Sequence, residues 1–169
     1  KMVIINSPGN PTGAVYTEEE LRAIGEVASY EDIMILSDEI YEKLIYGDHK
    51  HVSIASISEE LKSLTVICHG FAKAYSMTGW RIGYTAAPPE MAAAIAKIQS
   101  HTTSNATTFA QYGALAALSG SQDFVEDMRS EYDVRRQFVH ARLSAIPNIS
   151  VQNPGCLLYT SPSPRDSDS

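Results

Sequence analysis

Short apolar runs alternate with amphipathic stretches along most of this chain, and this alternation limits the folds open to it. The apolar runs have the length of buried strands and cover residues 2–5, 33–37, 64–68 and 81–86. The amphipathic stretches predict helices at residues 18–29, 88–99, 109–118 and 122–145. Strands that alternate with helices in this way predict a mostly parallel sheet with right-handed crossovers. The expected fold class is therefore α/β, with a doubly wound sheet.

Local signals indicate where several elements begin. Thr17, followed by Glu20 three residues later, is a capping box, and the acids of this first turn suit the positive end of the helix dipole. Pro88 and Pro89 open the next predicted helix, where the missing proline N–H does no harm. Residues 149–151 predict the first strand of a second domain.

Size and charge exclude several classes of partner. The chain has 169 residues, which is enough for one sizeable core. Its net charge of −7 argues against nucleic acid or an anionic membrane surface as a partner. No stretch approaches the roughly 20 apolar residues of a membrane-spanning helix. The two cysteines do not make a disulfide framework, so the cytoplasm is the expected compartment.

The two ends of the chain differ from the rest. Lys1 stands in place of an initiator methionine and leads directly into a strand, so we expect the chain to be a fragment truncated at its N-terminus. From Cys156 the composition changes to Ser, Pro and Asp, and residues 156–169 resemble the translation of a transposase-type sequencing adapter. We interpret this segment as a library artefact, and a genuine disordered tail is the alternative.

Polar side chains follow three of the predicted strands. Asn10 lies in Asn-Pro-Thr-Gly after the first strand, Asp38 directly follows the second, and Lys73 follows the third. Because the carboxyl ends of parallel strands meet at one edge of a sheet, we expect these side chains to lie near one another, at the edge where such sheets bind ligands. Each residue alone also has an ordinary explanation, as a turn, a helix cap or a solvated surface residue.

The loop around Lys73 is the most specific of these segments. Residues 70–83 read Gly-Phe-Ala-Lys-Ala-Tyr-Ser-Met-Thr-Gly-Trp-Arg-Ile-Gly, with Arg81 eight positions after the lysine. This stretch resembles the cofactor-lysine motif of the fold type I, pyridoxal-phosphate-dependent aminotransferases of classes I and II. Asn10 in Asn-Pro-Thr-Gly and Asp38 in Asp-Glu-Ile-Tyr resemble two further motifs of that family, in the same order along the chain.

The resemblance implies a role for each of these residues. Lys73 would bond covalently to the cofactor aldehyde and would then move a proton at the substrate Cα. Asp38 would pair with the protonated pyridine nitrogen and keep it charged. Tyr41 and Asn10 would hydrogen-bond the phenolic oxygen, and Arg81 would hold the phosphate with its fork of N–H donors.

The resemblance covers residues 2–150 and also implies a domain plan. Residues 1–120 would be the C-terminal half of the large, cofactor-binding domain, and residues 121–155 would be a linking helix and the start of the small domain. The family's phosphate loop, its ring-stacking aromatic residue and its substrate-carboxylate arginine would lie outside this chain.

The implied activity is transfer of an amino group between an amino acid and a 2-oxo acid. Aspartate is the favoured donor, because residues 77–84 look most like the aspartate aminotransferase branch. Two alternatives stay open: a lyase or synthase with the same fold and cofactor, and the effector domain of an aminotransferase-like transcription regulator. The implied partners are the two substrates and, at full length, a second copy of the chain.

No metal site is expected. The five histidines are scattered, and no cysteine–histidine spacing resembles a zinc site. His69, which precedes the lysine loop, is interpreted as a hydrogen-bonded loop histidine, with a pocket-lining role as the alternative.

Overall fold

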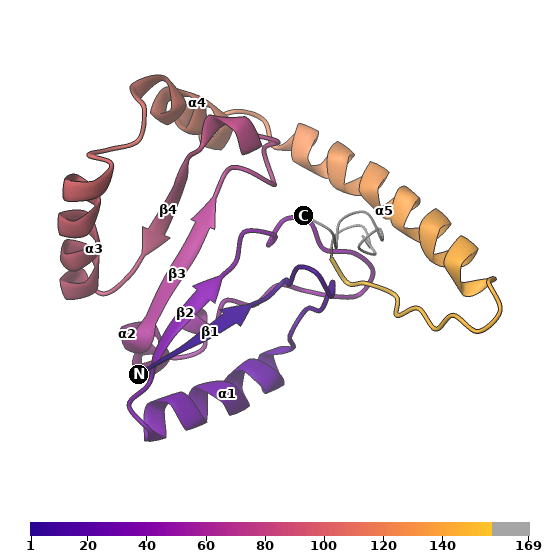
Figure 1. The fold of residues 1–169 in the computed structure, drawn as a ribbon, viewed down its shortest axis with the longest axis horizontal. Coiled ribbons are helices and arrows are strands. Elements are labelled where there is room, and N and C mark those ends of the chain that lie inside the picture. Colours follow the sequence, from indigo (N-terminus) through magenta and orange to yellow (C-terminus); the bar gives the residue numbers. More distant parts are fainter. Residues whose placement is uncertain (157–169) are drawn as a thin grey trace, which may run out of the picture.

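A four-stranded sheet forms the centre of the computed structural model, which describes residues 1–156. The strand order is β1-β2-β3-β4, and the strands are Met2–Asn6, Met34–Asp38, Thr65–Gly70 and Gly83–Ala86. β2 pairs in parallel with both β1 and β3, whereas β4 runs antiparallel to β3. The predicted α/β class with a mostly parallel sheet is confirmed (Figure 1).

Helices join and flank these strands. They are α1 (Glu18–Tyr30), α2 (Glu59–Leu64), α3 (Pro89–Thr102), α4 (Thr108–Ser119) and α5 (Asp123–Ser144), with 3-10 turns η1 (Ile54–Ser56) and η2 (Thr78–Trp80). Figure 1 shows α1 below β1, α3 beside β4, and α5 extending away from the sheet. Within residues 1–156, no helix combines the length and the apolar character needed to cross a membrane.

The predicted capping box starts α1. Glu20 donates its backbone N–H to Thr17 Oγ1 at 3.2 Å, and Thr17 donates its own to Glu20 Oε2 at 2.8 Å. With its first turn fixed, the helix lays Leu21 and Ala28 on the sheet. They join a core cluster drawn from both strands and helices, whose buried members are Ile5, Leu21, Ala28, Ile35, Ile54 and Leu61.

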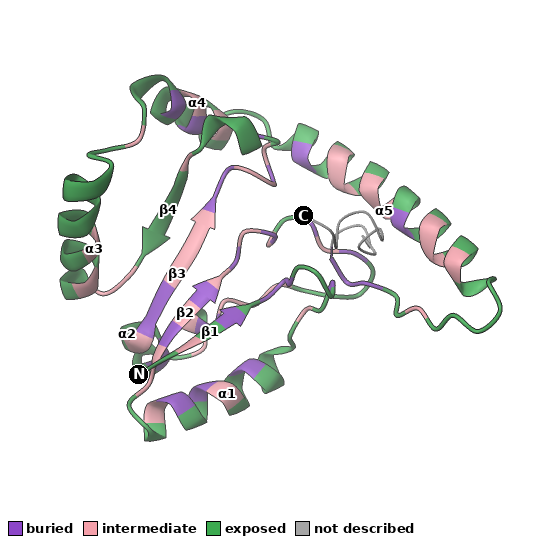
Figure 2. Cartoon of the chain, in the orientation of Figure 1, coloured by how far each residue is buried: buried purple, intermediate pink, exposed green. Residues whose placement is uncertain are grey.

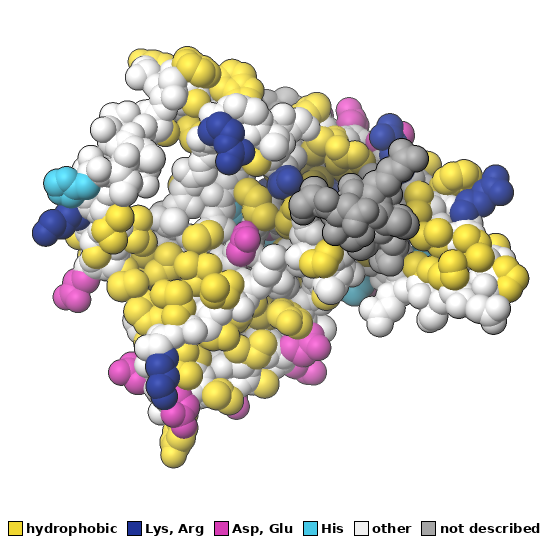
Figure 3. Space-filling view, viewed as in Figure 1, with side chains coloured by type: hydrophobic (Ala, Val, Ile, Leu, Met, Phe, Trp, Pro, Cys, Tyr) yellow, Lys and Arg dark blue, Asp and Glu magenta, His cyan; other side chains and the backbone are white. Residues whose placement is uncertain are grey.

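The sheet is covered on one face and largely open on the other. Ile5 is 4% exposed, whereas Met2 and Ile4 on the same strand are 51% and 69% exposed. Successive residues of a strand point to opposite faces, so Ile5 packs in the core while Ile4 lies on the open face. Figure 3 shows hydrophobic side chains gathered at the surface over the strands.

The later helices contribute little to this core. Figure 2 shows burial concentrated in β1 to β3 and α1, with β4 exposed and α3 to α5 mostly so. α3 has no buried residue, and the buried residues of α5 are Val125 and Arg136. α4 packs through Ala114 on Phe71 and Met77, which lie in the loop after β3.

The end of the described chain packs on the loop that follows β1. Gly155 and Cys156 donate their backbone N–H groups to the Gly13 carbonyl at 2.9 and 3.1 Å. Arg136 of α5 holds the same segment through a hydrogen bond to the Asn153 side chain. The segment 156–169, predicted to be an artefact or a tail, lies outside the described residues except for Cys156, which is fully buried.

Three details differ from the sequence-based expectations. The strand predicted at residues 149–151 is wrong, and an isolated bridge pairs Ile45 with Cys156 instead. β4 begins at Gly83 rather than at residue 81, because Arg81 has a left-handed φ of 52° that no strand residue adopts. α2 was not predicted, since its 6 residues are too few to show a helical period.

Candidate active site

The carboxyl ends of the three parallel strands meet at one edge of the sheet, as expected (Figure 1). Asp38, the last residue of β2, is in register with Asn6 of β1 and with Cys68 of β3. Its Oδ1 accepts a hydrogen bond from the Ile40 backbone N–H at 3.2 Å. One carboxylate oxygen therefore holds the turn that leads to Tyr41.

Three of the five predicted site residues meet beyond this edge. Asn10 donates from Nδ2 to the Tyr41 hydroxyl at 3.4 Å, and Lys73 Nζ lies 5.4 Å from the centre of the Tyr41 ring. Tyr41 is 5% exposed, so surrounding residues restrict the movement of the ring that contacts both Asn10 and Lys73. A cation over an aromatic face is electrostatically favourable, and this contact positions the lysine amine.

Arg81 lies farther along the same loop. Its left-handed conformation follows η2, and its Nη1 donates to the Thr78 carbonyl at 3.1 Å. A guanidinium has five N–H donors, so this bond leaves it able to bind an anion as well. Within residues 1–156, neither Arg81 nor Asp38 makes a hydrogen bond or an ion pair with Lys73.

Two glycines make these loop paths possible. Gly13 has a φ of +70°, and a Cβ at this position would lie 2.4 Å from the Cβ of Pro154. A Cβ on Gly70 would lie 3.0 Å from the Cα of Gly83, so glycine lets β3 and β4 approach closely just before the lysine loop. Both positions need a residue without a side chain.

Two acid–imidazole pairs flank the site, and sequence reasoning missed them. Glu39 follows Asp38 directly, and its Oε2 lies 3.0 Å from His51 Nε2. Glu42 follows Tyr41 directly, and its Oε1 lies 3.3 Å from His69 Nε2. The sequence does show that a glutamate directly follows each of two predicted site residues. It does not show which histidines these glutamates contact, because the histidines are distant in the sequence. His69 lies on β3 rather than in a loop.

The pairs shift the ionisation of their members. The His69 imidazole, whose Nε2 lies 3.3 Å from Glu42 Oε1, lowers the pKa of Glu42 to about 2, although burial opposes this change. Burial works against a proton on His69, but Glu42 and Glu39 outweigh it and raise the pKa of the ring above its usual value. Burial and the nearby Asp38 raise the pKa of the Cys68 thiol, which favours its neutral form.

The acids and His51 also bring possible metal ligands together. Glu39, Glu42 and His51 place ligand atoms within 4.8 Å of one another. However, the hydroxyls of Ser37 and Ser53 already donate to Glu39 Oε1 at 2.8 and 2.7 Å. Hydrogen bonds within the protein thus account for this cluster, and it supports no metal site.

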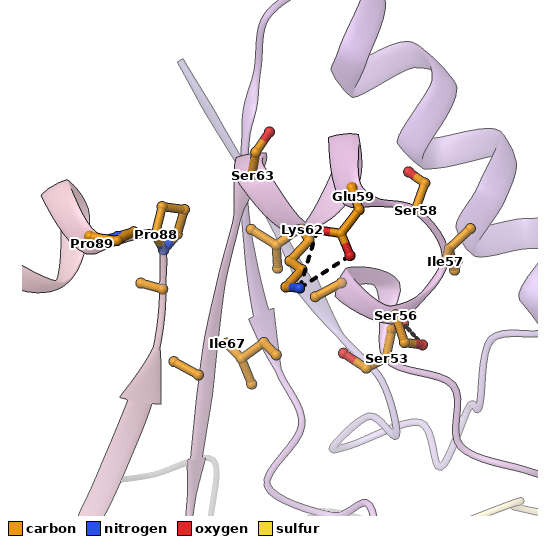
Figure 4. A pocket seen from close by; sticks show the side chains of 14 residues that line it. Ser53, Ser56, Ile57, Ser58, Glu59, Lys62, Ser63, Ile67, Pro88 and Pro89 are labelled. Carbon is orange, nitrogen blue, oxygen red and sulfur yellow. Dashed lines mark hydrogen bonds and ion pairs between the residues drawn. The ribbon is translucent and has the colours of Figure 1, made fainter.

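A pocket of about 930 Å³ lies at the other end of the sheet. Figure 4 shows Pro88 and Pro89 on one side of it, and the Lys62–Glu59 ion pair with a group of serines on the other. It borders Thr65, the first residue of β3, whereas Lys73 follows the last. This pocket is therefore separate from the candidate site.

Comparison with known proteins decides the family. Residues 1–168 match the family described as aminotransferase class I and II. The chain belongs to this family. An aspartate aminotransferase of Geobacillus stearothermophilus is 51% identical over 166 residues, which are 98% of this chain and 42% of that protein. A probable aspartate/prephenate aminotransferase of Aquifex aeolicus is 52% identical over 164 residues, covering 96% of this chain and 42% of its own length.

Solved structures of the same family share the fold. The aspartate aminotransferase of Rhizobium meliloti superposes with a TM-score of 0.89 at 36% identity, covering 92% of this chain and 39% of that one. The described residues thus have the fold of part of this aminotransferase. The chain spans about two fifths of the length of the curated relatives it matches, with 42% for the Geobacillus protein.

Proposed function

We propose that this chain forms part of an aminotransferase that uses pyridoxal phosphate to move an amino group from aspartate to a 2-oxo acid. The observation that carries the proposal is that Lys73 lies over the Tyr41 ring while Asn10 contacts the Tyr41 hydroxyl, at the carboxyl edge of the sheet. The names of the relatives, which include aspartate and aspartate/prephenate aminotransferases, support this reaction class and this donor.

The chemistry of the donor set fits the cofactor. Lys73 offers an amine for the aldehyde, Asp38 a carboxylate for the ring nitrogen, and Arg81 a guanidinium for the phosphate. The Tyr41 hydroxyl and the Asn10 amide, already 3.4 Å apart, would share the phenolic oxygen as a ligand. When bound, the cofactor supplies an electron sink for the negative charge that develops at the substrate Cα.

The residues of this chain would carry out proton transfer at the substrate, keep the cofactor ring protonated and position the lysine amine. Lys73 would hold the cofactor through its amine, and the same amine would act as the general base that removes the proton from the substrate Cα. Asp38 keeps a proton on the ring nitrogen, because an adjacent anion favours the charged form of that group. Tyr41 holds the lysine amine over its ring, at 5.4 Å from the ring centre, and its hydroxyl would bind the phenolic oxygen.

The proposal extends to the arrangement of the whole protein. We assign residues 1–120 to the cofactor-binding domain and residues 121–155 to the link and the start of a smaller domain. A homodimer in the cytoplasm is the proposed state of the complete enzyme, and the exposed apolar residues of α4 and α5 are available for further packing.

A chimera tests the proposal directly. Residues 1–155 replace the matching segment of the Geobacillus aspartate aminotransferase, and transfer from aspartate to 2-oxoglutarate is measured. We expect transfer in the chimera, loss of transfer in Lys73→Ala, and no change in the exposed control Lys97→Ala. Borohydride should fix the cofactor to Lys73. Fixation at Lys43, Lys62 or Lys97, or transfer that survives Lys73→Ala, would disprove the assignment.

A further inference from the structure

Glu39 is a buried carboxylate with every oxygen engaged. The residue is 3% exposed, its Oε1 accepts from Ser37 and Ser53 at 2.8 and 2.7 Å, and its Oε2 lies 3.0 Å from His51 Nε2. Burial of an unpaired carboxylate is strongly unfavourable, and this set of partners offsets the cost. The Glu39 backbone N–H also donates to the Cys68 carbonyl of β3 at 3.0 Å. Glu39 therefore connects the turn after β2 to β3 through its backbone, and to the loop around His51 through its side chain.

Glu42 makes a second link of the same kind. Its Oε1 lies 3.3 Å from His69 Nε2, which is an ion-pair distance, and this nitrogen makes no hydrogen bond among the described residues. His69 accepts the Gly70 backbone N–H on Nδ1 at 2.7 Å, so the proton of the neutral ring lies on Nε2, the nitrogen next to Glu42. The ring also stacks on Tyr84 of β4, with centroids 5.2 Å apart.

These links connect the segments that carry the site. Asp38 and Tyr41 alternate with Glu39 and Glu42 along one short turn after β2, and His69 is the residue before the last of β3. The lysine loop starts directly after β3, so the Glu42–His69 pair joins the turn that holds Tyr41 to the strand that leads to Lys73. The pair spans the same two segments as the contact between the lysine amine and the Tyr41 ring.

We propose that Glu42 and His69 are positioning residues, which fix the Tyr41 turn against the lysine loop and so set the affinity of the site for pyridoxal phosphate. Glu39 and His51 hold the same turn through a second pair, whose side-chain atoms lie within 4.8 Å of Glu42. This inference rests on the proposed function, since it assigns these residues to the support of the same site.

The charges around the pair predict how it responds to pH. Glu42 faces His69, Lys43 and His51, and His69 faces Glu42, Glu39, the Gly70 N–H and the Tyr84 ring. Its partners lower the pKa of Glu42 from 4.5 to about 2, so its contribution is present above pH 4.5 and is lost as the pH falls toward 2. The pKa of His69 is raised above 6.5, so its contribution is present below 6.5 and is lost as the pH rises through the raised value.

The test uses the chimera and its variants Glu42→Gln and Glu59→Gln. The second is a matched control, because Glu59 is exposed and pairs with Lys62 at the surface. We expect Glu42→Gln to raise the Kd for pyridoxal phosphate about tenfold, a size typical of lost partners that orient binding groups. The Kd of the unchanged chimera should rise as His69 loses its proton, and this step should move to lower pH in Glu42→Gln. Glu59→Gln should change neither.

A readout without cofactor checks the pair itself. In the unloaded chimera, the His69 ring should titrate above its ordinary value by NMR, and Glu42→Gln should lower that midpoint. If Glu42→Gln lowers thermal stability but leaves both the Kd and its pH step unchanged, the pair is only structural and the inference is wrong. A chimera that binds no pyridoxal phosphate at all would instead overturn the proposed function, and this inference with it.

Discussion

Asp38 is the residue whose role follows most directly from its place at the end of a parallel strand. Its carboxylate lies at the shared edge and caps the turn toward Tyr41. We expect Asp38→Ala in the chimera to reduce transfer by at least about a hundredfold, a size typical of removing one preorganised charged group. Asp127→Ala, at an exposed position of α5, is the control. Near-normal transfer in Asp38→Ala would show that Asp38 does not face the ring nitrogen.

Gly13 sets the path of the Asn10 turn. Its φ of +70° disfavours any residue with a side chain, and a Cβ would meet Pro154 and the Cys156 carbonyl at 2.4 and 2.9 Å. We predict that Gly13→Ala destabilises the chimera by roughly 1–3 kcal/mol, measured by urea unfolding. Gly47→Ala is the comparison, because Gly47 also has a positive φ of 64° but open space around it. Equal losses in both variants would mean that strain alone, without the contact to the C-terminal segment, accounts for the effect.

Individual residues also show how far sequence reasoning reaches. Asn10, Asp38 and Lys73 follow parallel strands, so their approach to one edge could be predicted from strand order alone. The Glu42–His69 pair could not be predicted, because nothing local in the sequence indicates which acid lies beside which imidazole. The predicted strand starts at Arg81, although this residue has a left-handed backbone conformation. A run of apolar residues does not indicate the sign of φ at its first position.

At the scale of elements, the capping box of α1 was predictable because both partners lie within one turn. Thr17→Ala removes the acceptor of the Glu20 N–H and leaves the Glu20 carboxylate without its side-chain partner. We expect a loss of about 1 kcal/mol in the free energy of unfolding, with Thr17→Ser nearly neutral because it keeps the hydroxyl. A loss below a few tenths of a kcal/mol in Thr17→Ala would show that packing of Leu21 and Ala28 fixes the helix start without the cap.

Elements that depend on distant partners were harder to predict. The three long helices of the C-terminal half are an exception, since their predicted ends lie within a few residues of those of α3, α4 and α5. The short α2 and the irregular segment at 149–151 have no helical period. Their conformations depend on packing against η1 and on the bonds of residues 153–156, which local sequence does not encode.

At the scale of the whole molecule, burial is uneven. Ile5, Ile35 and Leu61 share a core with α1, but α3 buries nothing and large apolar residues stay exposed on α4 and α5. The exposed ones on these two helices are Phe109, Tyr112, Leu115, Leu118, Phe124, Val134 and Phe138. Because most helix stability in proteins comes from packing, α3 and α5 should be the least protected elements of the isolated chain.

Hydrogen exchange can measure this difference. In the 169-residue chain alone, we expect amides of β2 and α1 to exchange slowly and those of α3 and α5 to exchange near the rate of an unfolded peptide. In the chimera, the same α3 and α5 peptides should gain protection, because the rest of the enzyme supplies surfaces for their apolar residues. Exposed apolar faces also favour association, so the isolated chain should aggregate at concentrations where the chimera does not. Slow exchange of α3 and α5 in the isolated chain would show that these helices are stable without further packing, and the exposed residues would then need another explanation.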